Sequence, residues 1–207
     1  MNENQTLPAT IVTYRLKRPK LDVLYPAVSG LRNPAAQQKI NAEIARTVHE
    51  LNRQQGYPQN PLTEITGTYE IKTNERGVLS LSLYNYAYSG GAHGNTINRS
   101  LTFDTNTGRL YRLQDLFKPG ADYVKILSDI VAVQIQARKL PTLEPFASIR
   151  PDQDFYIADK SLVIYFQLYE LLPYVYGFPY FPISVYSIEP IVNEEGPLGK
   201  MLSSIPL

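Results

Sequence analysis

The long central stretch, residues 63–104, is patterned almost throughout as β-strand, and it constrains the fold more than any other part of the chain. Residues 65–72 and 96–104 have strand-like composition, and residues 78–88 alternate leucine with serine before becoming aromatic. Residues 74–77 have the composition of a tight turn. Because strands joined by short turns pair antiparallel, this stretch predicts an antiparallel meander.

Two helices are predicted from apolar residues at three- and four-residue spacing. Asn33 followed by Pro34 is typical of an N-cap and a first helical turn. The apolar face of this first helix comprises Ile40, Ile44, Val48 and Leu51. Pro119 and Gly120 open the second helix, whose wider apolar face comprises Tyr123, Ile126, Leu127, Ile130, Val131 and Ile135. Both faces are expected to cover a sheet.

Further strands are expected on either side of the central stretch. They are residues 10–17 with a continuation over 20–25, residues 155–158, 161–168 and 182–186. Pro19 indicates an edge or a bulge in the first of them, because proline cannot donate to a sheet ladder. The predicted fold is therefore α+β, an antiparallel sheet meander with two main helices.

The chain is expected to contain an N-terminal α+β module with a glycine-rich loop, a C-terminal α+β module and a tail. The modules are residues 1–112 and 113–190. The tail, residues 191–207, has two glycines and two prolines among small residues, and we expect it to be loosely attached.

Composition excludes several classes of function. The chain has 20 basic and 19 acidic residues, so its net charge of +1 provides no field for binding nucleic acid. It has no cysteine and only two histidines, His49 and His93, so neither a disulfide framework nor a metal site is predicted, and no cofactor is implied. No apolar run approaches the roughly 18 residues that span a bilayer, and the first residues lack a signal-peptide pattern. Membrane attachment would need a segment absent from this chain, and a cytoplasmic protein remains an alternative.

The glycine-rich loop, residues 89–94, contains the residue types of a hydrolytic triad. Ser89 and His93 lie within it, and Asp104 ends the strand that follows. Nothing in this spacing requires the geometry of a triad, and the glycines do not match a phosphate-binding loop. The loop is better interpreted as a structural turn whose glycines permit unusual backbone angles. Similarly, Asp152, Asp154 and Asp159 lie in turn-like sequence where aspartate bonds the local backbone, so no catalytic residue is assigned.

Aromatic residues are dense between Tyr165 and Tyr186, in a chain with 16 tyrosines and no tryptophan. They could form a stacking platform for sugars or a protein-binding surface. Alternation along residues 163–168 points about half of them into the core, whereas residues 173–177, Pro-Tyr-Val-Tyr-Gly, are too rich in turn formers to be wholly buried. Exposed tyrosines on a loop favour recognition of a partner surface.

Two groups of motifs resemble a known bacterial domain pair of formerly unknown function. The first is residues 84–94, Tyr-Asn-Tyr-Ala-Tyr-Ser-Gly-Gly-Ala-His-Gly, followed by Phe103-Asp104, Thr107-Gly108 and Leu113-x-Asp115-Leu116-Phe117. The second is Phe166-x-x-Tyr169-Glu170-x-x-Pro173-Tyr174, then Gly177, Pro179, Phe181 and Pro182-Ile183. The resemblance covers nearly the whole chain up to about Pro190, and neither motif is a catalytic signature.

Members of this family occur as the extracytoplasmic part of a lysozyme-binding anti-sigma factor and as the non-catalytic N-terminal region of a peptidoglycan deacetylase. The resemblance implies that the C-terminal module is similar in fold to a subdomain of the actin-like ATPase of heat-shock proteins, without its phosphate loops. It also implies an extracytoplasmic or cell-envelope location. The chain departs from those members in lacking a transmembrane helix and a deacetylase domain.

The predicted function is a non-catalytic binding or sensing module whose partner is a protein such as lysozyme or the cell-wall glycan. The predicted ligand-binding residues are Tyr88, His93, Tyr174 and Tyr176, which lie on loops that the core does not require. The alternative functions are a glycan-active hydrolase, with His93 and an aspartate as acid and base, and a deacetylase-associated domain acting on peptidoglycan.

Overall fold

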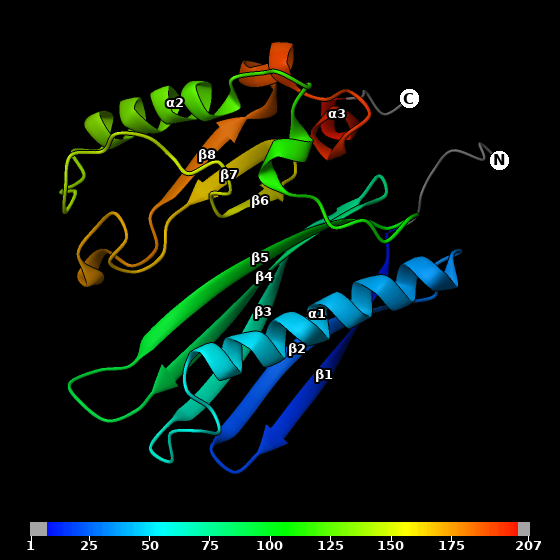
Figure 1. Cartoon of the computed structure of the whole chain (residues 1–207). Coiled ribbons are helices and arrows are strands. Elements are labelled where there is room, and N and C mark those ends of the chain that lie inside the picture. Colours follow the sequence, from blue (N-terminus) through cyan, green and yellow to red (C-terminus); the bar gives the residue numbers. More distant parts are fainter. Residues whose placement is uncertain (1–7, 203–207) are drawn as a thin grey trace. The chain divides into compact units, whose positions relative to one another are not determined.

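A computed structural model describes residues 8–202 and divides the chain between Leu110 and Tyr111 into two compact units (Figure 1). Unit 1 ends at Leu110 and unit 2 begins at Tyr111. Each unit contains one sheet, and most strand pairs in both sheets are antiparallel. The α+β class is therefore confirmed.

Unit 1 is a five-stranded sheet in the order β1-β2-β3-β4-β5. The strands are β1 (Thr10–Arg18), β2 (Leu21–Ser29), β3 (Glu64–Glu75), β4 (Val78–Tyr88) and β5 (Asn95–Asp104). The meander predicted for residues 63–104 is confirmed, because β3, β4 and β5 pair antiparallel in this order. The sheet as a whole is not an antiparallel meander, because β2 and β3 run parallel, with Leu21 opposite Ile65. The helix α1 (Pro34–Gln54) connects these two strands, and a crossover of this length returns the chain to the same end of the sheet.

The hairpin between β1 and β2 confirms the edge that was one of the two expectations for Pro19, and the pairing has no bulge. Pro19 lies in the turn, and the two strands pair antiparallel from Arg18 opposite Leu21 to Thr10 opposite Ser29. Proline therefore ends a strand here instead of interrupting one. The strand that it ends, β1, is an edge of the sheet.

The helix α1 covers one face of the sheet in unit 1 (Figure 1). The Asn33 side chain accepts hydrogen bonds from the backbone of Ala35 and Ala36, as predicted for an N-cap. The predicted apolar face of α1 packs with the alternate leucines of β4 in one core cluster, which includes Ile40, Ile44, Val48, Leu51, Leu79, Leu81 and Leu83. Burial of these two faces holds the helix on the sheet.

Unit 2 contains a three-stranded sheet in the order β6-β7-β8. Its elements are the strands β6 (Phe155–Ala158), β7 (Ser161–Tyr165) and β8 (Tyr180–Ser184), the helices α2 (Tyr123–Ala137) and α3 (Pro197–Leu202), and the 3₁₀ helices η1 (Leu113–Leu116), η2 (Tyr174–Tyr176) and η3 (Val185–Ile191). Pro119 and Gly120 precede α2 as a turn, because Asp122 caps the helix by accepting from the backbone N–H of Lys125. The predicted start of this helix is therefore a few residues early.

The chain after Pro190 is packed into unit 2, contrary to the expectation of a loose tail. Val192 forms a β-bridge with Phe117, and Val192, Leu198 and Met201 are all at most 1% exposed. Three apolar side chains in the segment are thus part of the core, despite its glycines and prolines. Residues 203–207 lie outside the described part. Between residues 8 and 202, no helix combines the length and apolar character needed to cross a bilayer.

Candidate functional site

The glycine-rich loop joins β4 to β5 and is held by two tyrosines of β4. Gly90 and Gly91 have φ angles of +87° and +111°, and residues that carry a side chain rarely adopt such angles. The Tyr88 hydroxyl donates a hydrogen bond to the Gly91 carbonyl at 3.0 Å. The Tyr86 ring lies directly against Gly94, where a Cβ atom would approach the ring to 2.4 Å. The loop therefore has a defined backbone path.

Substitution of these glycines tests whether the loop needs that path. We expect Gly90→Ala and Gly91→Ala each to lower the free energy of unfolding by about 1 kcal/mol, because alanine is strained at positive φ. Gly94→Ala should also lower the free energy of unfolding, but because its Cβ atom would clash with the Tyr86 ring and not because of its φ angle. Adding Tyr86→Ala should remove this clash. Thermal melts of the single and double variants measure both effects, and unchanged midpoints throughout would mean that the loop is flexible.

The three residue types of a hydrolytic triad do not meet in unit 1. His93 is exposed, and its Nδ1 lies 2.8 Å from the Gly94 carbonyl oxygen. The Ser89 hydroxyl lies 2.8 Å from that of Thr63. Asp104 is at the far end of β5, roughly 30 Å along the strand, where its Oδ1 accepts from the backbone N–H groups of a turn. Each group has a local structural contact instead of a place in one catalytic arrangement.

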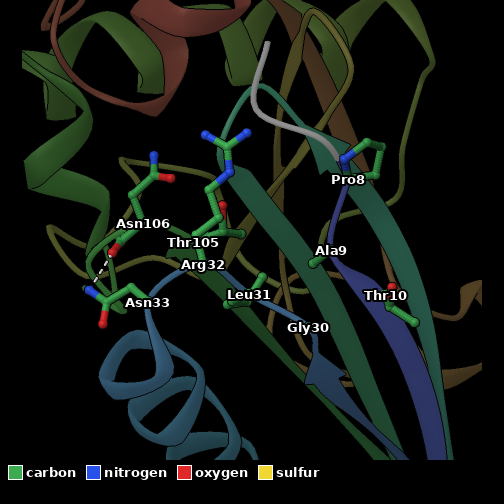
Figure 2. Close-up of a pocket in the computed structure, with 9 residues that line it drawn as sticks. All are labelled: Pro8, Ala9, Thr10, Gly30, Leu31, Arg32, Asn33, Thr105 and Asn106. Carbon is green, nitrogen blue, oxygen red and sulfur yellow. Dashed lines mark hydrogen bonds between the residues drawn. The ribbon is translucent and has the colours of Figure 1, made fainter. Parts of the chain in front are cut away.

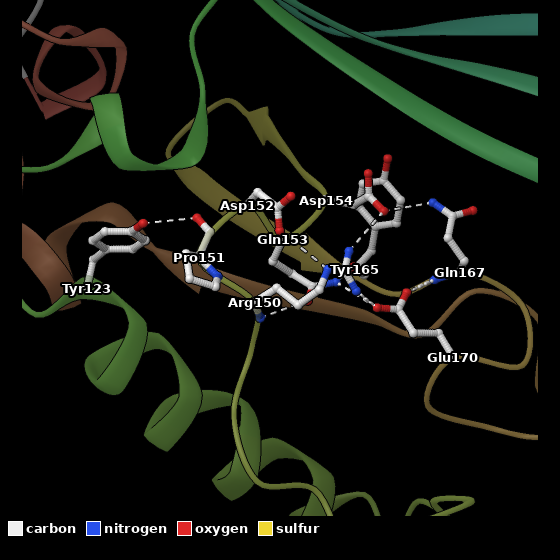
Figure 3. Close-up of polar contacts among 9 residues, drawn as sticks. All are labelled: Tyr123, Arg150, Pro151, Asp152, Gln153, Asp154, Tyr165, Gln167 and Glu170. Atoms are coloured by element: carbon white, nitrogen blue, oxygen red, sulfur yellow. Dashed lines mark hydrogen bonds and ion pairs between the residues drawn. The ribbon is translucent and has the colours of Figure 1, made fainter. Parts of the chain in front are cut away.

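Three acidic residues of unit 2 lie around one arginine, Arg150 (Figure 3). The Arg150 guanidinium forms an ion pair with Glu170 and lies 3.5 Å from Asp152 and 3.8 Å from Asp154. Asp154 also accepts a hydrogen bond from the Gln167 amide at 2.9 Å. The third aspartate considered from the sequence, Asp159, has a φ of +50° in the turn between β6 and β7. Asp152 and Asp154 thus lie against the Arg150 side chain and Asp159 lies in a separate turn, so none of the three is assigned a catalytic role.

Metal binding finds no support among residues 8–202. No group of three or more histidine, aspartate or glutamate side chains there is arranged to hold an ion. His49 is exposed on α1.

The aromatic loop, residues 169–178 of unit 2, presents a cluster of large exposed side chains. Val175 is 84% exposed, Tyr176 is 54% exposed and Tyr169 is 53% exposed. The Tyr174 ring stacks on that of Tyr169 with 5.4 Å between centroids. Large apolar groups gathered at the tip of one loop are characteristic of a contact surface.

The base of the aromatic loop is anchored by polar contacts. Glu170, bound to Arg150, also accepts a hydrogen bond from the Gln167 backbone at 2.7 Å. Buried Gln153 donates to the Tyr165 carbonyl at 2.8 Å, where β7 ends before the loop. Within the loop, the Gly177 N–H donates to the Tyr174 carbonyl at 3.0 Å, and Gly177 has a φ of +67°. The exposed side chains therefore project from a fixed base, which lowers the entropy lost when a partner binds.

The predicted ligand-binding residues form two sets. Tyr88 and His93 lie at the glycine-rich loop of unit 1, and Tyr174 and Tyr176 lie on the aromatic loop of unit 2. All four are at least partly exposed. The sequence interpretation missed Val175, which is more exposed than either neighbouring tyrosine, although its place between them was a usable signal.

One cavity of about 450 Å³ lies at the start of α1 (Figure 2). Its lining residues include Arg32, Asn33 and Asn106. The Asn33 amide donates to the Asn106 carbonyl at 2.8 Å, while the Asn33 side-chain oxygen caps the helix. The N-cap side chain thus makes structural contacts with both its oxygen and its nitrogen, and the cavity carries no assigned function.

Comparison with known protein families matches the two halves of the chain separately. Residues 17–96 match the family described as deacetylase PdaC, and residues 114–186 match a protein family of unknown function, DUF3298. The two matches occur in the order that the sequence motifs implied, so the resemblance to this domain pair is confirmed.

Two curated relatives come from Bacillus subtilis (strain 168). The anti-sigma-V factor RsiV is 31% identical over 179 residues, which cover 79% of this chain and 62% of that protein. The peptidoglycan-N-acetylmuramic acid deacetylase PdaC is 29% identical over 76 residues, which cover 37% of this chain and 16% of that protein. The chain therefore spans less than two thirds of either relative.

Two solved structures of DUF3298 family proteins share the fold over nearly the whole chain. The protein from Pseudomonas aeruginosa PAO1 has a TM-score of 0.69 at 16% identity, with 98% of this chain and 99% of that chain covered. The protein from Bacteroides fragilis NCTC 9343 has a TM-score of 0.64 at 14% identity, with coverages of 97% and 98%.

Proposed function

We propose that this chain, a PdaC-type segment followed by a DUF3298 segment, is a non-catalytic binding or sensing module of the bacterial cell envelope. The match to an anti-sigma factor and the partial match to a peptidoglycan deacetylase support an envelope role. The aromatic loop carries the proposal within the structure, because it offers Tyr169, Val175 and Tyr176 on an anchored base.

We further propose that the partner is a lysozyme-like protein or the wall glycan itself. Tyrosine suits either partner, because its ring stacks on sugars and apolar surfaces while its hydroxyl bonds to polar groups. Tyr88 and His93 are proposed as a second contact region on unit 1. A likeness of unit 2 to a subdomain of the actin-like heat-shock ATPase fold also remains a proposal and implies no ATPase activity.

Truncation of the loop tyrosine tests this function. Tyr176→Ala should weaken binding to lysozyme or to peptidoglycan by about 2 kcal/mol, roughly 30-fold, while its melting temperature stays unchanged, because an exposed side chain contributes little to folding. Titration calorimetry with lysozyme and a pull-down with purified peptidoglycan measure the two partners separately.

Tyr186→Ala is the matched control, since Tyr186 is 50% exposed in the same unit but lies on η3. It should bind as the unsubstituted chain does. Equal losses in Tyr176→Ala and Tyr186→Ala would contradict a role for the aromatic loop. Failure of the unsubstituted chain to bind either partner would contradict the proposed sensing function.

A further inference from the structure

The strand β1 has one side that no described strand covers. It is an edge of the five-stranded sheet and, among the described strands, pairs only with β2. All of its nine residues except Ile11 and Leu16 are exposed. A long exposed edge offers a row of backbone N–H and C=O groups that another extended segment can pair with.

One face of β1 is apolar. Side chains alternate between the faces of a strand, so Val12, Tyr14 and Leu16 share one side. Val12 is 39% exposed and Tyr14 is 53% exposed, and the Tyr14 ring stacks on that of Tyr25 in β2 with 5.9 Å between centroids. Apolar side chains on an added strand would cover the exposed side chains of Val12 and Tyr14.

The C-terminal half of β1 is basic and incompletely neutralised. Arg15 forms a two-pronged ion pair with Asp22, with nitrogen–oxygen distances of 2.7 and 2.5 Å. The hydrogen bond from Arg15 lowers the pKa of Asp22, and both oxygens of this carboxylate are bound to Arg15. Lys17 lies opposite Asp22 in the ladder and its charge also lowers the pKa of that carboxylate. In the described part of the chain, however, no acidic group lies within 4.0 Å of Lys17 or Arg18.

We propose that the edge of β1 binds an extended protein segment as an added strand, and that acidic residues alternate with apolar residues in this segment. The apolar residues would lie beside Val12 and Tyr14, and the acidic residues on the other face would lie beside Arg15 and Lys17. Backbone pairing would supply affinity, and the alternating side chains would supply specificity.

A second copy of this chain fits the edge less well than such a partner. The sequence of β1, Thr-Ile-Val-Thr-Tyr-Arg-Leu-Lys-Arg, contains no acidic residue. Pairing two β1 edges would therefore bring no negative charge to Lys17 or Arg18. Pro19 and the basic residues at this end are also features that discourage self-association of sheet edges.

A labelled synthetic peptide tests the proposal on the full chain. Its sequence alternates glutamate with valine over about the length of β1, and binding is measured by fluorescence anisotropy at low salt. Two N-methylated versions carry methyl groups on alternate amides, in one version on the glutamates and in the other on the valines. Because only every second amide of an added strand faces the sheet, one version should lose binding and the other should retain it.

Charge reversal on β1 provides the second measurement. Lys17→Glu with Arg18→Glu should weaken peptide binding at least about tenfold, since Lys17 shares a face with the acidic residues of the peptide and its attraction becomes a repulsion. Arg18 lies on the other face at the end of the strand, where its reversal adds a second negative charge close to them. Lys39→Glu with Arg53→Glu makes the same change of net charge on exposed positions of α1 and should leave affinity nearly unchanged.

Three results would overturn the proposal. The peptide could fail to bind the unsubstituted chain, the two N-methylated peptides could bind equally, or the α1 variant could lose as much affinity as the β1 variant. Sedimentation that shows a dimer abolished by Lys17→Glu with Arg18→Glu would instead assign the edge to a second copy. None of these results bears on the aromatic loop, so the proposed function is tested separately.

Discussion

Gly108→Ala is expected to destabilise unit 1 by about 3 kcal/mol, because it combines backbone strain with a clash against a helix. Gly108 has a φ of +74° in the turn that follows β5. A Cβ atom at this position would lie 2.8 Å from the Ala36 carbonyl oxygen and 3.0 Å from the Ala36 Cα. Both are backbone atoms of α1, so neither can move away without displacing the helix.

Gly30→Ala is the matched control for this prediction. Gly30 has a nearly identical φ of +70°, but a Cβ atom added there would have nothing within 4 Å of it. Its substitution should therefore cost only the strain of a left-handed backbone, about 1 kcal/mol. Urea unfolding followed by circular dichroism measures both variants. Equal losses would show that the close approach to α1 contributes nothing.

The elements that local pattern determines could be predicted from the sequence. Asn33 and Pro34 predicted the start of α1, and the leucines of β4 predicted a strand with one face in the core. Such signals depend on residues only a few positions apart. The structure has the start of α1 and the core face of β4 where these signals predicted them. The turn residues between β3 and β4, and between β6 and β7, were found for the same reason.

The features that depend on distant residues could not be predicted. The parallel pairing of β2 with β3 depends on the end of the sheet at which the chain arrives after α1. No pattern of neighbouring residues determines this position. The ion pair between Arg150 and Glu170 joins residues on either side of β6 and β7, so the anchoring of the aromatic loop was invisible in the sequence. The exposure of Tyr176 was anticipated from the proline and glycine around it, but the support beneath it was not.

The end of the chain shows how composition can mislead. Glycines and prolines after Pro190 suggested a loose tail, whereas Leu198 is 0% exposed and lies in α3. The sequence signal that was available is the spacing of Leu198 and Met201, which places two apolar side chains on one face of a helical turn. Single apolar residues in a segment rich in helix breakers are easily discounted.

Leu198→Ala is expected to destabilise unit 2 by about 3 kcal/mol, because it leaves a cavity where a fully buried side chain was. Leu202→Ala is the control, since Leu202 ends the same helix and is only half-buried, and it should cost less than about 1 kcal/mol. Urea unfolding monitored by tyrosine fluorescence measures both variants. If Leu198→Ala unfolds at the same urea concentration as the unsubstituted chain, the segment after Pro190 is loosely attached, as composition alone suggested. A large loss would instead show that α3 is part of the core that stabilises unit 2, the unit that carries the aromatic loop.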